Sequence, residues 1–216
     1  MAEKYYPIFL DLSCRTVVVV GGGEVAWRKV ESLGAAGARV RVVAPEIDSR
    51  IGVLAGPECR REPYTAAALE GATLAIAATD RPEVNSQVAA DCRRLGILCN
   101  VVDVPEECDF IVPSVLQQGP LVIAVSTGGA APSAAGRIRR RIEREFGPAY
   151  GLWLSRLGRL RSSLKSRVAD EAVRRELFLR LSADDVLAAA EAGEAALEKK
   201  VSDILAALGL EETDRA

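Results

Sequence analysis

The chain has 216 residues, 49% of them hydrophobic, and a net charge of −2 without any histidine, so the commonest metal ligand and general base at neutral pH is absent. Its five cysteines are an odd number without a Cys-x-x-Cys pair, which argues against a disulfide framework and a zinc site. No apolar run approaches the roughly 18 residues of a membrane-spanning helix, and no signal peptide is recognisable, so we expect a cytoplasmic protein that does not bind membranes.

The first expected elements are a strand at residues 15–20 and a helix at residues 24–36, joined by three glycines. The turn between strand and helix matches the pattern G-x-G-x-x-A. In this pattern Gly21 makes the turn, Gly23 lets a pyrophosphate approach the backbone, and Ala26 lets the helix pack closely on its strand. The first N–H groups of a helix lack partners and attract phosphate. The predicted cofactor-binding residues of this segment are Gly21, Gly22, Gly23, Glu24 and Val25. A tight turn that binds no ligand is the alternative interpretation.

A second strand is expected at residues 39–44, which completes a βαβ unit. An Asp or Glu at the end of this strand usually binds the ribose hydroxyls, but the sequence has Ala44 and Pro45 there. Glu46 comes one or two positions after the usual place of the acidic residue. The adenosine end of a dinucleotide would therefore be held by backbone groups. Because no arginine follows the strand directly to receive a 2′-phosphate, the sequence favours NAD over NADP.

The alternation of strand and helix continues, with a short extended piece at residues 59–63 and a short helix at 65–69. Strands are then expected at 74–78 and 97–102, with a helix at 83–95 between them. This alternation predicts an α/β fold, a Rossmann-like doubly wound parallel sheet, whose ligands bind at the carboxyl ends of the strands. The residues expected at that edge are Ala44, Pro45, Thr79, Asp80, Asn100, Val102 and Asp103.

After Pro105 the pattern changes to two short strands, at residues 110–114 and 121–126, with no room for a helix between them. We expect an antiparallel pair that forms a homodimerisation element. The turn Ser126-Thr127-Gly128-Gly129 leads into a helix at about 134–145, and is either a second anion cradle or a plain helix cap. The expected domains are a cofactor-binding domain at 1–109, a dimerisation region at 110–147 and a helical domain at 148–216, with helices at 152–169, 171–181 and 183–208, the last interrupted at Gly193.

Positive charge is concentrated in residues 137–180, which hold 13 basic and 5 acidic side chains, a net charge of +8. Such a block attracts nucleic acid or a small polyanion, and is also compatible with a solvated helix face. The block lacks interleaved aromatic residues and a recognisable reading helix, so we expect no nucleic-acid partner.

Six motifs together resemble the precorrin-2 dehydrogenase family, the dehydrogenase and chelatase part of sirohaem synthases. The resemblance covers most of residues 5–145, in the right order. The motifs are PIFLDL (7–12), VVGGGEVAWRK (19–29), AATDRPEVN (77–85), CNVVD (99–103), FIVPS (110–114) and VSTGGAAP (125–132).

This resemblance implies oxidation of precorrin-2 to sirohydrochlorin with NAD⁺ as hydride acceptor, and in some members insertion of Fe²⁺ or Co²⁺. Asp103 matches the family's essential aspartate, and a carboxylate is a reasonable base in a chain without histidine. The substrate is a macrocycle with eight carboxylates, which gives the arginines at 137 and 139–141 a polyanion to bind. The predicted substrate-binding residues are Asn100, Ser126, Thr127, Gly128 and Arg137. The macrocycle itself would hold the metal, so no protein metal site is expected.

Two other functions stay open at this point. One is a nucleotide-sensing regulatory module, which also uses a Rossmann-type domain but needs no proton-transfer residue. The other is a chelatase that inserts metal into sirohydrochlorin without any requirement for NAD⁺.

Overall fold

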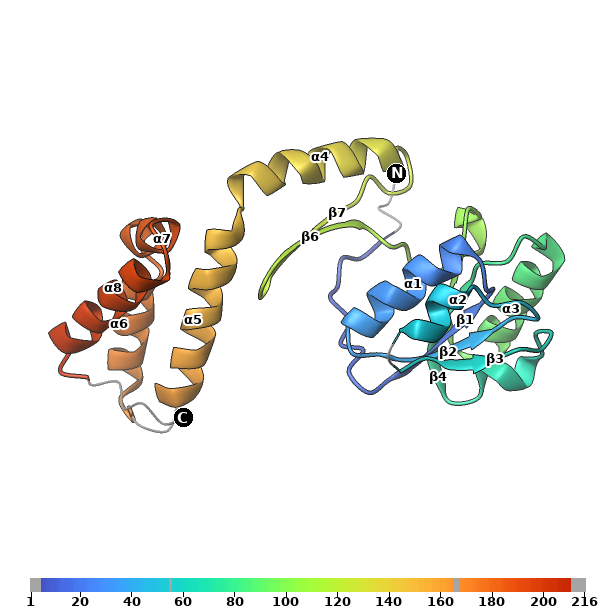
Figure 1. The fold of residues 1–216 in the computed structure, drawn as a ribbon, viewed down its shortest axis with the longest axis horizontal. Helices are drawn as coiled ribbons and strands as arrows, with labels where there is room; N and C mark the ends of the chain where they lie inside the picture. The colour runs from blue at the N-terminus through green and yellow to red at the C-terminus, as the bar shows by residue number, and fades with distance from the viewer. Residues whose placement is uncertain (1–4, 55, 165–167, 211–216) are drawn as a thin grey trace. The chain divides into compact units, whose positions relative to one another are not determined.

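The computed structural model describes residues 5–54, 56–164 and 168–210 (Figure 1). The chain divides into two compact units, Met1–Val112 and Pro113–Ala216, which are described separately below. The three domains expected from the sequence stay a prediction.

The first unit is built on a five-stranded parallel sheet with strand order β3-β2-β1-β4-β5, which confirms the predicted α/β fold. The register pairs Val20 of β1 with Val43 of β2 and with Ala77 of β4, and Ala77 with Val101 of β5. The carboxyl ends of these four strands are therefore level, at one edge of the sheet. The strands are β1 (Thr16–Val20), β2 (Arg39–Val43), β3 (Glu58–Arg60), β4 (Ala72–Ala77) and β5 (Leu98–Val101).

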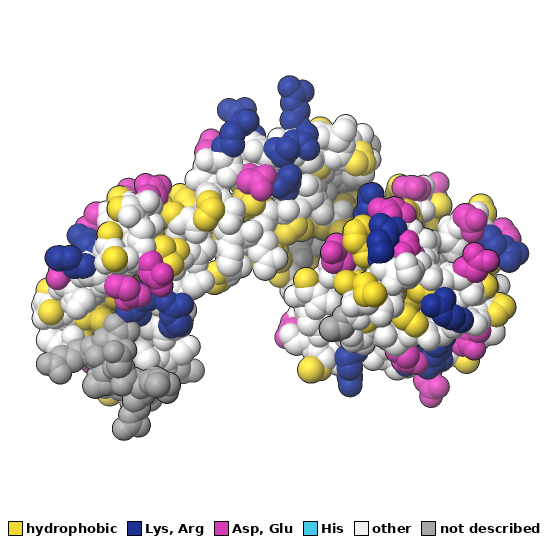
Figure 2. Space-filling view, viewed as in Figure 1, with side chains coloured by type: hydrophobic (Ala, Val, Ile, Leu, Met, Phe, Trp, Pro, Cys, Tyr) yellow, Lys and Arg dark blue, Asp and Glu magenta, His cyan; other side chains and the backbone are white. Residues whose placement is uncertain are grey.

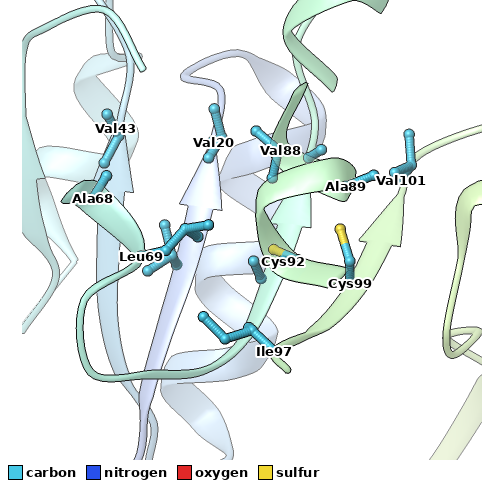
Figure 3. Packing of buried hydrophobic residues seen from close by; sticks show 13 residues of the cluster. Val20, Val43, Ala68, Leu69, Val88, Ala89, Cys92, Ile97, Cys99 and Val101 are labelled. Carbon is cyan, nitrogen blue, oxygen red and sulfur yellow. The ribbon is translucent and has the colours of Figure 1, made fainter. Parts of the chain in front are cut away.

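Helices cover both faces of this sheet, because its strands are apolar on both sides. One face packs on α3, where Val88, Ala89 and Cys92 meet Val20 and Val101 (Figure 3). The other face packs on α1 through a second buried cluster. The helical segments are α1 (Glu24–Ala35), α2 (Ser49–Val53), η1 (Ala66–Leu69), α3 (Pro82–Leu95) and η2 (Pro105–Glu107). The sequence did not predict α2 and η2, which are short.

The second unit begins with an antiparallel hairpin of β6 (Ser114–Gln118) and β7 (Leu121–Val125). The expected pairing is confirmed, but the predicted strand at 110–114 is wrong by four residues at its start. Phe110 packs instead against the core of the first unit, and its carbonyl accepts a hydrogen bond from Asn100. Pro113 lacks the N–H that a strand ladder needs, so the hairpin begins after it. Gly119, with a φ of 55°, makes the tight turn.

Five helices follow in the described residues of this unit, and four of them enclose a separate apolar core in which Leu177, Leu197 and Val201 are fully buried. The predicted interruption at Gly193 is confirmed, since this residue has a φ of 118° and precedes the last helix. The helices are α4 (Pro132–Glu145), α5 (Pro148–Leu164), α6 (Glu171–Leu181), α7 (Asp184–Glu191) and α8 (Glu194–Ala207). The end of the predicted helix at 152–169 includes residues 165–167, which lie outside the described residues.

Arginines gather on α4, where the space-filling view shows basic side chains projecting from the surface (Figure 2). Arg139 is paired with Glu143 at 2.7 Å, whereas Arg137, Arg140, Arg141 and Arg144 are exposed. In the described part of the chain, no helix combines the length and the apolar character needed to cross a bilayer.

Candidate cofactor and active site

The glycine loop after β1 is shaped by two close backbone contacts. Gly21 has a φ of 128°, and a Cβ built on it would lie 2.2 Å from the carbonyl oxygen of Ala78. A Cβ on Gly22 would lie 2.0 Å from the carbonyl oxygen of Glu46. Both residues must therefore be glycine for the loop to pack against the segments that follow β4 and β2.

Gly23 differs from its two neighbours because it faces open space. A Cβ on it would meet no atom within 4 Å, and its φ of −89° is available to any residue. It is the N-cap of α1 and provides no side-chain cap, so the N–H groups of Glu24 and Val25 begin the helix without one. This open helix start fits a bound pyrophosphate. Ala26 is fully buried, as close packing of the helix on its strand requires.

The segment after β2 folds back onto the glycine loop. Ala44 is buried and Pro45 is exposed, and the Asp48 N–H donates to the carbonyl of Gly22 at 2.8 Å. The Asp48 carboxylate caps the start of α2 by accepting from the Arg50 N–H at 2.9 Å.

No arginine follows β2 directly, as the sequence indicated, but α2, which was not predicted, brings Arg50 to the start of α1. Its guanidinium pairs with Asp48 at 2.6 Å and with Glu24, and lies 4.4 Å from the centre of the Trp27 ring. The Arg50 hydrogen bonds lower the pKa of Asp48 to about 2. They also lower the pKa of Glu24, to which Arg28 contributes as well.

The turn after β4 carries Thr79 and Asp80 at the same edge and is held from α3. The Asn85 side-chain oxygen accepts from the Thr79 N–H at 3.2 Å and from its hydroxyl at 2.8 Å. The Asn85 amide donates to the Thr79 carbonyl at 3.1 Å. Asn85 is only 7% exposed, so its side chain stabilises the turn through hydrogen bonds that are shielded from solvent. This residue was not predicted from the sequence, although its position near the start of a helix opened by Pro82 was a signal.

Asp103 lies in a tight turn directly after β5. Its φ of 63° is in the left-handed region, where an aspartate is tolerated but uncommon. The turn is closed by a hydrogen bond from the Val104 N–H to the Val101 carbonyl at 3.3 Å, and the Asp103 side chain is exposed. Backbone strain of this kind is frequent at functional sites.

The Cys108 thiol stabilises this turn through contacts with backbone groups. Its sulfur lies 3.1 Å from the Val101 carbonyl and 3.3 Å from the Val104 carbonyl, so the thiol can donate to either oxygen. The sulfur also accepts from the Val101 N–H at 3.2 Å and from the Asn100 amide at 3.5 Å.

We expect Cys108→Ala to lower the free energy of unfolding by about 1–3 kcal/mol, since the backbone groups of the buried Val101 lose the half-buried thiol as a partner. Cys108→Ser is the matched control, because a hydroxyl has the same donor and acceptor capacity. Urea unfolding of both variants measures the difference. Equal stability of Cys108→Ala and the unaltered protein would contradict the role given to this thiol.

Asn100 is 8% exposed, and its amide also donates to the Phe110 carbonyl at 2.9 Å. This amide is thus used within the fold, and its predicted contact with a substrate stays a prediction. The structure places the expected positions of the first unit at one edge, because they lie in or after the last residues of strands that end level there: Gly21 to Val25, Ala44 and Pro45, Thr79 and Asp80, and Asn100 to Asp103.

The predicted residues of the second unit form a separate, self-capped turn between β7 and α4. The Ser126 hydroxyl accepts from the Gly128 N–H at 3.1 Å, and the Thr127 hydroxyl accepts from the Ala131 N–H at 3.1 Å. Arg137 is exposed on α4. The two hydroxyls thus stabilise the turn itself, Ala131 at the start of α4 has no side-chain cap, and binding of an anion by the turn stays a prediction. The described residues hold no group of three or more Cys, Asp or Glu side chains placed to bind a metal ion.

Comparison with known families gives two adjacent matches along the chain. Residues 8–114 match the model for a putative NAD(P)-binding domain, and residues 118–145 match the central region of sirohaem biosynthesis proteins. The first match spans the glycine loop, Asp103 and the strands that carry them.

Among curated proteins, the siroheme synthase of Stutzerimonas stutzeri (strain A1501) is 42% identical over 215 residues, covering 95% of this chain and 46% of that protein. The siroheme synthase of Pseudomonas putida (strain W619) is 45% identical over 174 residues, covering 79% of this chain and 38% of that protein. The chain therefore spans less than half the length of these two relatives.

Among solved structures, SirC, a precorrin-2 dehydrogenase, matches with a TM-score of 0.75 at 24% identity, covering 93% of this chain and 98% of that one. This likeness establishes that the two proteins share a fold. Together with the family matches and the curated relatives, it confirms the resemblance noted in the sequence. The chain thus carries a putative NAD(P)-binding domain and the central region of sirohaem biosynthesis proteins, and it is similar over 95% of its length to a curated siroheme synthase.

Proposed function

We propose that this chain oxidises precorrin-2 to sirohydrochlorin with NAD⁺ as the hydride acceptor. The observation that carries the proposal is the position of Asp103. This exposed carboxylate is held in a left-handed turn after β5, at the sheet edge where Gly23 opens the start of α1. The similarity to siroheme synthases over 95% of the chain supports this choice of reaction.

The glycine loop fits a dinucleotide, since a Cβ at Gly23 would occupy the open space from which a pyrophosphate approaches the helix. The N–H groups of Glu24 and Val25 would donate to the phosphates, and Gly21 and Gly22 keep the loop folded. We assign the rest of the cofactor contacts to Ala44, Pro45, Thr79, Asp80 and Val102, which follow the neighbouring strands.

Asp103 is the proton acceptor in this proposal. NAD⁺, when bound, supplies the acceptor for the hydride that leaves the macrocycle. Oxidation also removes a proton from the macrocycle, and the Asp103 carboxylate takes it up. The strained turn and the Cys108 contacts hold the carboxylate at the sheet edge, so little reorganisation is needed for the transfer.

Binding of the substrate would use the positive surface of the second unit. Precorrin-2 carries eight carboxylates, and the exposed guanidinium of Arg137 can make charge-assisted hydrogen bonds with them. Ser126, Thr127 and Gly128 would contact a carboxylate at the turn before α4. Asn100 of the first unit stays a predicted substrate contact. A homodimer through β6, β7 and α4 is supported by the exposed Val115 and Ile138, each 45% exposed. The cytoplasmic location and the use of Fe²⁺ or Co²⁺ as a second substrate stay predictions.

We expect NAD⁺ to be preferred over NADP⁺ because Glu24 and Asp48 already neutralise Arg50. A 2′-phosphate near this cluster would meet two carboxylates, with which Arg50 is already paired. The double variant Glu24→Gln with Asp48→Asn is expected to reduce the NAD⁺ preference in kcat/KM roughly tenfold, because it frees Arg50. Asparagine is as good an N-cap as aspartate, so α2 is retained. An unchanged cofactor preference would show that this cluster does not select the cofactor.

The experiment that tests the function is anaerobic incubation of the protein with precorrin-2, with and without NAD⁺, following sirohydrochlorin and NADH by absorbance. We expect sirohydrochlorin and NADH to form in equal amounts, and only when NAD⁺ is present. Failure to form sirohydrochlorin while NAD⁺ still binds would refute the dehydrogenase and favour a sensing module. Metal insertion into supplied sirohydrochlorin, without oxidation of precorrin-2, would favour a chelatase.

A further inference from the structure

Arg61 directly follows β3, at the edge of the sheet where the glycine loop lies. The register pairs Arg60, the last residue of β3, with Val43, the last residue of β2. The Ala44 N–H donates to the Arg60 carbonyl at 3.1 Å, so the two strands stay paired to their ends. Because neighbouring strands lie about 4.8 Å apart, Arg61 lies beside the residues that follow β2. It was not among the site residues predicted from the sequence.

The side chain of Arg61 contacts the segment that follows β2. Its guanidinium donates to the Ile47 carbonyl at 3.4 Å. Ile47 in turn lies against the glycine loop, since a Cβ built on Gly22 would come within 2.9 Å of the Ile47 Cα. The next residue, Asp48, donates its N–H to the Gly22 carbonyl at 2.8 Å. These contacts connect the guanidinium to the glycine loop through one short segment of chain.

The guanidinium has more donors than the fold uses. An arginine has five N–H donors, and Ile47 accepts from this one over a long distance. Arg61 is exposed, and in the described part of the chain no carboxylate oxygen lies within 4.0 Å of its guanidinium. Three nearby arginines differ, because each of them is paired with a carboxylate: Arg41 at 3.0 Å, Arg50 at 2.6 Å and Arg60 at 2.7 Å.

The position of Arg61 suits the adenosine half of a dinucleotide. In Rossmann-type domains the adenosine ribose lies at the end of the second strand, where an acidic side chain usually binds its hydroxyls. This chain has Ala44 and Pro45 there, and neither side chain can form a hydrogen bond. A hydroxyl group accepts hydrogen bonds as well as donating them, so a donor can replace the missing acceptor. Arg61 is such a donor, at the end of the neighbouring strand.

We propose that Arg61 binds the adenosine half of NAD⁺ by donating hydrogen bonds to the hydroxyl oxygens of its ribose. The contact adds a side chain to the backbone groups expected to hold this end of the cofactor. It rests on the NAD⁺ binding of the proposed function, but not on the oxidation of precorrin-2.

The contact is tested by calorimetry with NAD⁺ and with ADP-ribose, which lacks the nicotinamide. We expect Arg61→Met to weaken the binding of both ligands roughly threefold to tenfold, because charge-assisted hydrogen bonds at an exposed site are lost. Arg39→Met is the matched control, since this exposed arginine begins β2 at the opposite edge of the sheet and should not affect either ligand. Normal NAD⁺ affinity in Arg61→Met, or a loss seen with NAD⁺ but not with ADP-ribose, would overturn the proposal.

Two further ligands identify the group that Arg61 contacts. ADP-ribose made with 2′,3′-dideoxyadenosine should bind equally to Arg61→Met and to the unaltered protein, because it lacks the hydroxyls. A loss that persists with this analogue would place Arg61 on the pyrophosphate and overturn the ribose contact. A 2′-phosphate would meet the same guanidinium, so NADP⁺ should be weakened at least as much as NAD⁺. A loss confined to NADP⁺ would overturn the ribose contact and assign Arg61 to a 2′-phosphate.

The same measurements separate this contact from the reaction. A protein that does not oxidise precorrin-2, but whose NAD⁺ affinity depends on Arg61, would refute the proposed function and support the contact. A protein that oxidises precorrin-2 with the same KM for NAD⁺ in Arg61→Met would support the proposed function and overturn the contact.

Discussion

Asp103→Asn is expected to slow the oxidation of precorrin-2 by roughly 10²- to 10⁴-fold, the usual contribution of a positioned general base. Asparagine has nearly the shape of aspartate and accepts the left-handed φ of 63° at this position, so the turn after β5 keeps its conformation. The variant therefore removes the basic carboxylate and little else. Single-turnover kinetics under anaerobic conditions, with saturating NAD⁺, measures the effect on the chemical step.

The controls separate chemistry from folding and binding. NAD⁺ affinity, measured by calorimetry, should be unchanged in Asp103→Asn, because the glycine loop is intact. Asp103→Gly should be at least as stable as the unaltered protein and equally slow, since glycine adopts positive φ without strain. Turnover within threefold of normal in Asp103→Asn would remove Asp103 from the mechanism. Assaying Co²⁺ insertion in the same samples shows whether one carboxylate serves both reactions.

The strand ends of the first unit were predictable because buried parallel strands have a strong local signature. The runs around Val17 to Val20 and Leu74 to Ala77 are apolar without interruption, and polar or small residues follow each of them directly. Strands of a doubly wound sheet end at one edge, so their order was not needed to bring Gly21, Thr79 and Asp103 to that edge. The amino-acid sequence alone was therefore enough to predict which strand ends form the candidate site.

The residues that support the site could not be predicted, because their contacts depend on how separate segments pack. Gly22 was predicted as a cofactor-binding residue, but its requirement for glycine follows only from the loop after β2, which returns to it. Arg50 reaches α1 only because the unpredicted helix α2 turns the chain back. Asn85 and Cys108 act through hydrogen bonds to turns on neighbouring strands. None of these contacts leaves a periodic trace in the sequence.

The misplaced strand at 110–114 shows a different difficulty. Its residues are apolar and have high strand propensity, but Phe110 is taken into the core of the first unit. Strand propensity mostly reports fit to a half-buried surface, so the competition between two possible packing partners decides the outcome. Pro113 then sets where the ladder can begin.

Gly23→Ala is expected to weaken NAD⁺ binding by roughly 10- to 100-fold, because a side chain would fill the approach to the helix start without disturbing the fold. A Cβ at Gly23 meets no protein atom within 4 Å. Alanine is a poorer N-cap than glycine by up to about 1 kcal/mol, so stability must be measured alongside affinity. Gly23→Ser removes this complication, since serine is a favoured N-cap and blocks the same approach.

The other glycines supply the matched comparisons. Gly21→Ala combines a φ of 128° with a 2.2 Å clash against the Ala78 carbonyl, and should lower the free energy of unfolding by several kcal/mol, about 1–3 for strain and about 1–3 for overpacking. A Cβ built on Gly34, within α1, would meet no atom within 4 Å. Gly34→Ala should therefore raise the free energy of unfolding by about 0.5–1 kcal/mol and leave NAD⁺ binding unchanged. If Gly23→Ser bound NAD⁺ normally, the start of α1 would not be the pyrophosphate site. The loop would then be the tight turn without a ligand that the glycine pattern alone also allows.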